Sequence, residues 1–312
     1  MRKSLLIHPD ELSEKWIARA KELGITTLSL HPRGGKQAAQ SLAEMLAMLE
    51  TAEYRALLDR AAEAGLAIEY EFHAAGYLLP REEFENHPDW FRMGEDGERI
   101  RDLNFCFTNP EAVDFVAKRA AELAKKLYRS THTYYFWMDD VKDSMCRCPS
   151  CREKSEPDLQ LHVLNAIQRE LRREIPDARL AYLAYFGTMG VPETEKPEDG
   201  IFLEYAPFDR DPHRPMREQT DHDSLILPSL LAFFGKDDAK VLEYWFDNSM
   251  YSGWQKPPKA FSADAPVVGD DLRYYRSLGF EVLSSFACYL GSDYEALYGE
   301  PDLSCFAERT DA

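Results

Sequence analysis

The chain has 312 residues, of which 45% are hydrophobic, 12% aromatic and 29% charged, and its formal net charge is −18. This length and apolar content allow a sizeable core and exclude a disordered chain. The negative charge argues against nucleic acid or an anionic membrane surface as a partner, because both favour basic patches.

Strands and helices are predicted to alternate along the chain. Short apolar or aromatic runs, typical of buried strands, lie at 5–7, 26–30, 66–72, 133–138, 179–186, 200–205, 241–246 and 281–287. Helical patterns lie at 11–23, 41–64 (one long helix or two), 110–128, 157–174, 224–234 and 269–278. Gly24 and Gly65 are expected to end two helices, and Asn109 to cap the helix that begins at Pro110. The connection 74–108 is too long for an ordinary loop and is expected to be functional.

Eight strands alternating with helices, with no flexible linker between them, predict one domain over 1–312: a single (β/α)8 TIM barrel with a long loop after the third strand. The alternative is an open doubly wound sheet. That fold usually has a glycine-rich phosphate turn after its first strand, whereas His8 and Pro9 follow the first strand here.

The lengths of the apolar runs and the use of cysteine predict where the protein is found in the cell. The apolar run of the first predicted strand, 5–7, is too short for the core of a signal peptide, and no apolar run approaches the length of a membrane span. Six cysteines in a chain of this size are not a disulfide framework. We therefore expect a cytoplasmic protein with reduced thiols and no membrane partner. Surface aromatic residues such as Tyr251 and Trp254 leave a homodimer open.

The fourth predicted strand ends in two adjacent carboxylates, Asp139 and Asp140. Catalytic groups of TIM barrels stand at the carboxyl ends of the strands. Burying an unpartnered carboxylate is costly, so this pair is expected at a strand mouth, facing a ligand or a counter-charge. The alternative is a helix cap or an ion pair in an ordinary loop. The strand ends lack a lysine for a Schiff base, and the chain lacks a nucleophile elbow and a phosphate loop.

Further polar residues near strand ends are candidates for the same site. Glu71 and His73 share one face of the third strand, and Glu204 near the end of the sixth is expected to supply a further catalytic carboxylate. The alternative for Glu204 is an ion pair inside the barrel. Alternation along the seventh strand predicts that Trp245 and Asp247 share a face, as a sugar platform and a polar anchor, unless Trp245 simply packs in the core.

The remaining candidates depend on position alone. His8 and His31 each precede a proline at a strand end and could instead be structural, and Tyr185 lies near the end of the fifth strand. Arg92, in the long loop, could bind the carboxylate of a uronic acid. The predicted substrate-binding residues are His8, His31, Glu71, His73, Arg92, Tyr205, Tyr244, Trp245, Asp247 and Tyr289.

Three segments of the chain resemble a family of bacterial proteins, a domain-of-unknown-function family of glycosidase-like barrels. They are HPDWFRMGEDGERIRDLNFCFTNPEAV, FWMDDVKDSMCRCPSC and IFLEYAP. The Asp139–Asp140 pair is also distantly similar to the consecutive acids of barrel β-N-acetylhexosaminidases and O-GlcNAc hydrolases. That similarity implies that Asp139 orients the substrate acetamido group, which itself acts as nucleophile, and that Asp140 is the general acid.

Three cysteines, Cys146, Cys148 and Cys151, follow the acids at C-x-C-x-x-C spacing. This spacing is typical of a structural zinc site, which needs a fourth ligand. The candidates for that ligand are His162, Asp143, Cys106 and Cys288. The alternative is that reduced thiols pack the loop without a metal.

We therefore predict a glycoside hydrolase that acts on a carbohydrate through carboxylate acid–base catalysis by Asp139, Asp140 and Glu204, with no cofactor required. Glu71 or Asp247 could supply the remaining carboxylate in place of Glu204. Two alternatives stay open. One is a metal-dependent sugar isomerase or epimerase with Glu71, His73, Asp140 and Glu204 as ligands. The other is a non-catalytic sugar-binding barrel.

Overall fold

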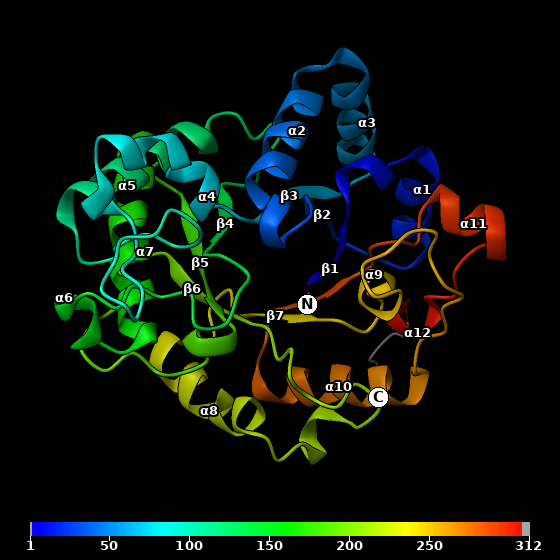
Figure 1. The fold of residues 1–312 in the computed structure, drawn as a ribbon. Helices are drawn as coiled ribbons and strands as arrows, with labels where there is room; N and C mark the ends of the chain where they lie inside the picture. The colour runs from blue at the N-terminus through cyan, green and yellow to red at the C-terminus, as the bar shows by residue number, and fades with distance from the viewer. Residues whose placement is uncertain (1, 308–312) are drawn as a thin grey trace. The chain divides into compact units, whose positions relative to one another are not determined.

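The computed structural model describes residues 2–307 of the chain. Eight strands are hydrogen-bonded in the order β1 to β8 and close into a barrel, with helices in the connections between them (Figure 1). The strand pairs with a defined register are parallel. The predicted (β/α)8 TIM barrel is therefore confirmed.

The strands are short, as is usual for this fold. They are β1 (Arg2–Ile7), β2 (Thr27–Leu30), β3 (Ala67–His73), β4 (Thr133–Trp137), β5 (Arg179–Ala184), β6 (Ile201–Tyr205), β7 (Lys240–Glu243) and β8 (Val282–Phe286). The longer helices are α1 (Glu14–Glu22), α2 (Ala38–Glu50), α3 (Ala52–Glu63), α5 (Pro110–Ala124), α7 (Glu156–Glu174), α8 (His222–Phe234) and α10 (Ala265–Leu278). The shorter ones are α4 (Ala75–Leu78), α6 (Pro149–Arg152), α9 (Asn248–Tyr251), α11 (Ser292–Tyr298) and α12 (Ser304–Ala307).

Local sequence signals account for several helix ends. Asn109 Oδ1 accepts hydrogen bonds from the backbone N–H groups of Glu111 and Ala112, which confirms the predicted cap of α5. Gly24 and Gly65 follow helices with φ of 66° and 87°, a conformation that glycine adopts without strain. The pattern at 41–64 is two helices, since Thr51 is extended between α2 and α3.

The seventh strand is shorter than predicted. It ends at Glu243, and the backbone N–H of Asp247 donates to the carbonyl of Tyr244 at 3.1 Å. Residues 244–247 therefore form a turn. The expectation that Trp245 and Asp247 share a strand face is wrong, because the two-residue alternation stops before Trp245.

The chain divides into two compact units. Within the described residues, the first unit takes 2–31, 52–69 and 203–307, and the second takes 32–51 and 70–202. In the first unit, β1 pairs with β2 and with β8, and β7 pairs with β6 and with β8. In the second, β4 pairs with β3 and with β5, and α5 packs along α7 (Figure 1). The single domain predicted over 1–312 stays a prediction.

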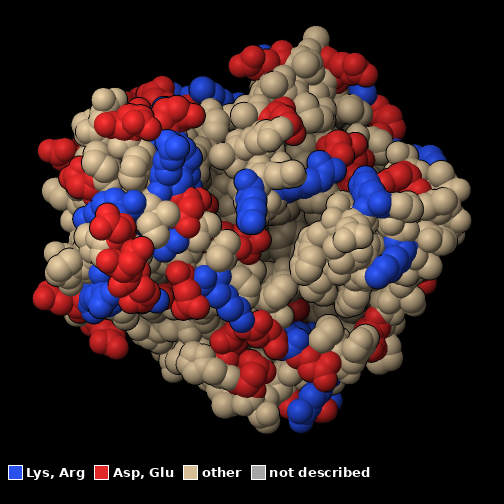
Figure 2. All heavy atoms as spheres, in the orientation of Figure 1, with Lys and Arg blue, Asp and Glu red and all other residues tan. Residues whose placement is uncertain are grey.

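Charged side chains of both signs share the surface. Figure 2 shows Asp and Glu side chains intermixed with Lys and Arg over the face drawn. Many of these charges form ion pairs, such as Lys118 with Asp114 at 2.7 Å. Among the residues that the structure describes, no helix combines the length and apolar character needed to cross a membrane.

Candidate active site

Asp139 and Asp140 follow β4 after one intervening residue, Met138, in the second unit. The backbone N–H of Asp139 donates to Asn104 Oδ1 at 2.9 Å, and Arg81 Nη2 lies 3.5 Å from Asp139 Oδ2. The Asp139 side chain is 12% exposed and that of Asp140 is 32% exposed. Burial raises the pKa of the Asp139 carboxyl, and Arg81 opposes that shift. Of two sequence neighbours, one carboxylate is thus held inside and the other reaches solvent.

Asp140 is surrounded by groups from β3, from the end of β5 and from the segment after β2. The Tyr185 hydroxyl donates to Asp140 Oδ1 at 2.9 Å, and His73 Nε2 lies 4.0 Å from Asp140 Oδ2. The other ring nitrogen of His73, Nδ1, lies 2.5 Å from the carbonyl oxygen of Met138 and donates there, which directs Nε2 at Asp140. A Cβ atom on Gly34 would lie 3.3 Å from Asp140 Oδ2, so glycine permits this close approach.

The structure therefore brings four of the candidate residues together: His73, Asp139, Asp140 and Tyr185. Arg81 and Asn104 join them and were not predicted. Both lie in the 74–108 connection, where no strand or helix periodicity fixes which side chains point at the acids. Its unusual length was the one signal that it contributes to a site.

In the first unit, histidine and aromatic side chains form a second cluster. The rings of His8 and His31 stack with centroids 5.9 Å apart, and His8 Nδ1 lies 2.7 Å from the His31 carbonyl oxygen. Tyr289 packs against His8 at 5.7 Å, and Phe286 contacts both His31 and Tyr244. Four predicted substrate-binding residues, His8, His31, Tyr244 and Tyr289, thus lie in one cluster. The contacts of both histidines are also those expected if their role is structural.

Glu204 forms a buried ion pair across neighbouring strands. Its Oε1 lies 3.1 Å from Lys240 Nζ, both side chains are 0% exposed, and the two residues are register partners of β6 and β7. This is the arrangement that the sequence offered as the alternative to catalysis. The Tyr205 hydroxyl donates to the carbonyl of Asp223 at 2.8 Å, and Glu71 is fully buried in β3.

A third group of polar residues lies around Arg210 in the first unit. Arg210 contacts Glu243 at 3.3 Å and Asp271 at 2.5 Å. Trp245 Nε1 donates to Asp271 at 3.0 Å, and the Tyr275 hydroxyl donates to Glu243 at 2.5 Å. Burial raises the pKa of Glu243 to about 7, although Arg210 opposes this.

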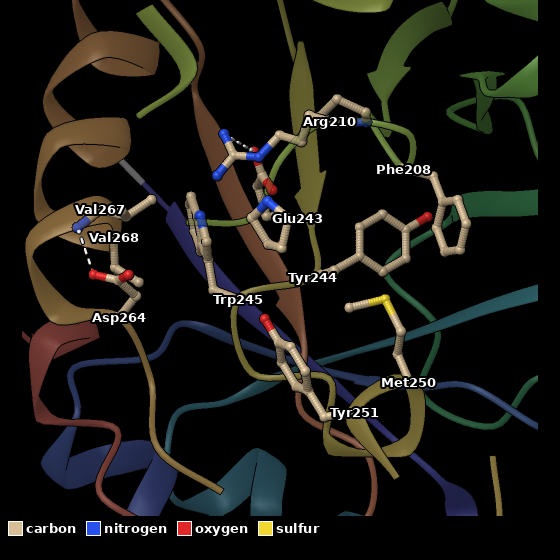
Figure 3. A pocket seen from close by; sticks show the side chains of 12 residues that line it. Phe208, Arg210, Glu243, Tyr244, Trp245, Met250, Tyr251, Asp264, Val267 and Val268 are labelled. Atoms are coloured by element: carbon tan, nitrogen blue, oxygen red, sulfur yellow. Dashed lines mark hydrogen bonds and ion pairs between the residues drawn. The ribbon is translucent and has the colours of Figure 1, made fainter. Parts of the chain in front are cut away.

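The Arg210 group borders a cavity of about 140 Å³. Figure 3 shows Phe208, Tyr244, Trp245 and Tyr251 around it. Trp245 is therefore a cavity wall with a hydrogen-bonded indole, a position compatible with both roles considered for it. Arg210 and Asp271 were not predicted, because neither lies at a strand end.

Two other predicted residues are engaged by neighbours. The Asp247 carboxylate caps α9, accepting hydrogen bonds from the N–H groups of Ser249 and Met250. Arg92 forms a two-point ion pair with Asp102, with distances of 2.8 and 2.6 Å. These contacts leave their predicted roles in substrate binding as predictions.

The predicted cysteine group acquires a fourth member. Among the described residues, the one group of three or more candidate metal ligands consists of Cys106, Cys146, Cys148 and Cys151, whose sulfur atoms all lie within 4.8 Å of one another. Of the four candidates for the fourth position, Cys106 is the one that joins them. His162 instead pairs with Glu195 at 3.2 Å.

The fold of the chain is similar to that of solved glycoside hydrolases. A GH5 xyloglucanase from Bacteroides ovatus, solved with a XXXG heptasaccharide, aligns with a TM-score of 0.52 and 12% identity over 95% of this chain. The alignment spans 66% of the xyloglucanase, just under two thirds of its length. A GH20 catalytic module of the pneumococcal exo-β-D-N-acetylglucosaminidase StrH aligns with a TM-score of 0.55 and 11% identity, over 98% of this chain and 84% of that chain. These identities establish likeness of fold alone.

The sequence itself identifies the family. Residues 44–228 match DUF4838, a domain of unknown function. Because this segment is more than half of the chain, the protein belongs to the DUF4838 family. No curated protein matches the chain. The resemblance to a domain-of-unknown-function family of glycosidase-like barrels is thereby confirmed.

Proposed function

We propose that this protein is a glycoside hydrolase in which Asp140 is the general acid and Asp139 orients the substrate. The observation that carries the proposal is the difference between the environments of the two adjacent carboxylates. Asp140 is the more exposed and meets Tyr185 and His73, whereas Asp139 is buried beside Arg81. Two acids in unlike environments are the requirement of glycosidic bond cleavage.

In the proposed reaction, Asp140 delivers a proton to the substrate. Its carboxylic acid form gives the proton to the glycosidic oxygen as the bond from that oxygen to the anomeric carbon breaks. Tyr185 fixes one carboxylate oxygen by a hydrogen bond, and His73 faces the other. The resulting carboxylate recovers its proton from the water that completes hydrolysis.

Asp139 suits a positioning role in a substrate-assisted mechanism. Its backbone is tied to Asn104 and its carboxylate lies beside Arg81, so it presents a fixed acceptor for an acetamido N–H group. The acetamido oxygen then attacks the anomeric carbon, and no further protein carboxylate is required as nucleophile. Glu204 is therefore not needed for catalysis and can remain paired with Lys240. The substrate class it favours is a β-N-acetylhexosaminide, and the StrH module has the same fold.

The test is turnover of a panel of aryl glycosides that includes N-acetylglucosaminides, glucuronides and glucosides. Asp140→Asn should lower kcat/KM by about 10²–10⁴-fold on the substrate that is turned over. Asp143→Asn is a matched control, since Asp143 is an exposed acid three residues away, with a side chain that is 88% exposed. Unchanged turnover in Asp140→Asn would overturn the assignment.

Substrates with different leaving groups distinguish the roles of the two carboxylates. Loss of a general acid slows substrates with poor leaving groups far more than those with activated ones, so Asp140→Asn should show this selectivity and Asp139→Asn should not. The opposite pattern would assign the acid to Asp139, whose pKa burial raises.

A non-catalytic sugar-binding barrel is the second candidate, favoured by the aromatic walls Tyr244 and Trp245 of the cavity in the first unit. It predicts oligosaccharide binding without turnover, insensitive to Asp140→Asn and weakened by Trp245→Ala. A metal-dependent isomerase stays the alternative from the sequence, and its ligand Glu204 would first have to leave Lys240.

A further inference from the structure

We propose that Cys106, Cys146, Cys148 and Cys151 bind one zinc ion, and that this ion fastens the long connection after β3 to the loop after β4. We call these segments the β3 loop (residues 74–108) and the β4 loop (residues 138–155). Cys106 belongs to the β3 loop and the other three cysteines to the β4 loop. The inference concerns metal binding and loop anchoring, and it stands whether or not the protein is a glycosidase.

The spacing of the sulfur atoms fits a tetrahedral ion. Zinc–sulfur bonds of about 2.3 Å place the corners of a tetrahedron about 3.8 Å apart. The sulfur of Cys106 lies 3.7 Å from that of Cys148 and 3.9 Å from that of Cys151. These separations are far beyond a disulfide bond, and all four thiols are free and buried.

Hydrogen-bond donors surround the sulfur atoms as they do around thiolate ligands. The backbone N–H of Met93 donates to Cys146 Sγ at 3.2 Å and that of Cys148 donates to it at 3.5 Å. Thr108 Oγ1 lies 3.2 Å from Cys151 Sγ, and Arg99 Nη1 lies 3.7 Å from Cys146 Sγ. Four thiolates and one Zn²⁺ carry a net charge of −2, which these donors and the guanidinium group offset.

The cluster is joined to the acid pair by a short path. Asn104, two residues before Cys106, accepts from the Asp139 N–H at 2.9 Å and donates to Ser144 Oγ at 2.8 Å. The Arg147 N–H donates to the Met93 carbonyl at 2.9 Å, a second link between the two loops. An ion at the cysteines would therefore hold the β3 loop where Asn104 meets Asp139.

Metal analysis of the full chain, purified without chelator, tests the inference. We expect about one zinc per chain, and replacement by Co²⁺ should give sulfur-to-cobalt charge-transfer bands together with the intense d–d bands of a tetrahedral site. Cys106→Ser should lower the zinc content to below about one fifth per chain, because three ligands bind far more weakly than four. Cys288→Ser and Cys305→Ser are matched controls, since both residues are buried cysteines outside the group.

A measurement on the unsubstituted chain covers the case in which the Cys106 variant fails to fold. Removing the metal with a strong chelator should accelerate amide hydrogen exchange in the β3 loop, while α5 and α7 keep their protection, and added zinc should reverse the change. A purified protein with no zinc, a site that holds iron instead, or β3-loop exchange unchanged by chelation would overturn the proposal. Full zinc retention in a folded Cys106→Ser variant would also overturn it.

Discussion

At the scale of single residues, the main feature is the unequal environment of Asp139 and Asp140. Adjacent side chains on a strand point to opposite faces, but both residues lie beyond Trp137, where β4 ends. The chain is therefore free to turn one carboxylate toward Arg81 and the other toward Tyr185. Because Met138 separates the end of β4 from Asp139, strand alternation does not force the two carboxylates to opposite faces, and both can lie near His73.

The Tyr185 hydroxyl provides a direct test of how Asp140 is held. Tyr185→Phe removes the donor to Asp140 Oδ1 and keeps the ring that contacts Phe186. A hydrogen bond to a charged group contributes about 1.5–3 kcal/mol to stability, and if it also holds Asp140 for the proposed catalysis, kcat/KM should fall by about 10–100-fold at a temperature where both proteins are fully folded. Phe186→Leu, a change in the neighbouring aromatic residue, is the control. Equal losses in the two variants would show that packing, and not the hydroxyl, is responsible.

The sequence predicted the acids of this site better than the residues around them. Asp139, Asp140 and His73 stand at strand ends, where strand patterning and barrel topology fix their place. Arg81 and Asn104 lie in the long β3 loop, whose path depends on tertiary contacts such as that of Asn104 with Ser144. Cys106 was one of four candidates for a metal ligand, since spacing along the chain says nothing about which distant side chain arrives.

At the scale of elements, the alternation of strands and helices was sufficient to predict the barrel. Each strand contains apolar residues within a segment too short for a typical helix, and Gly24, Gly65 and Asn109 mark helix ends as expected. The predicted end of the seventh strand was wrong because its hydrophobic residues continue to Phe246, inside the turn at 244–247. Trp245, Phe246 and Asp247 of that turn are buried, so composition alone does not distinguish them from a strand.

The ion pair between β6 and β7 predicts a large and specific loss of stability. Lys240→Met leaves the Glu204 carboxylate in the barrel interior without this cation, and breaking a buried pair typically costs about 3–5 kcal/mol. The double variant Lys240→Met/Glu204→Leu should recover most of that free energy of unfolding, because an apolar pair avoids the buried charge. Urea denaturation of the three proteins measures both effects.

Turnover by the double variant adds a second readout. If it folds and retains activity, Glu204 belongs to the barrel interior, and if it folds without activity, Glu204 has the catalytic role that the sequence proposed for it. A loss below about 1 kcal/mol in Lys240→Met would contradict the importance of the pair.

At the scale of the whole molecule, acidic groups outnumber basic ones, with 55 Asp and Glu against 37 Lys and Arg. Several carboxyl groups of the first unit are buried, and three of these have a raised pKa. Burial raises the pKa of Glu11 and of Glu243 to about 7, and that of Asp247 to about 6. The folded chain therefore holds these protons more tightly than the unfolded chain does.

This difference fixes the sign of the pH dependence of stability. Between about pH 4 and pH 7 the folded state binds more protons at these three sites than the unfolded state, so their contribution to the free energy of unfolding falls as the pH rises. Asp247→Asn removes one of the three groups and retains an amide oxygen that can cap α9. Between pH 4 and pH 7, the free energy of unfolding of this variant should fall by about 1–3 kcal/mol less than that of the parent. The size of this difference follows from the raised pKa of the Asp247 carboxyl.

Melting temperatures measured across this pH range test the expectation. Asp264→Asn is the matched control, because Asp264 also caps a helix, α10, but its side chain is 37% exposed. The Asp247→Asn curve should converge with that of the parent at low pH and lie above it at pH 7, and the Asp264→Asn curve shows how much of a change comes from replacing a cap carboxylate as such. Parallel curves for all three proteins would mean that the buried Asp247 carboxyl ionises at its ordinary pKa, and that the burial of this cap carries no electrostatic penalty.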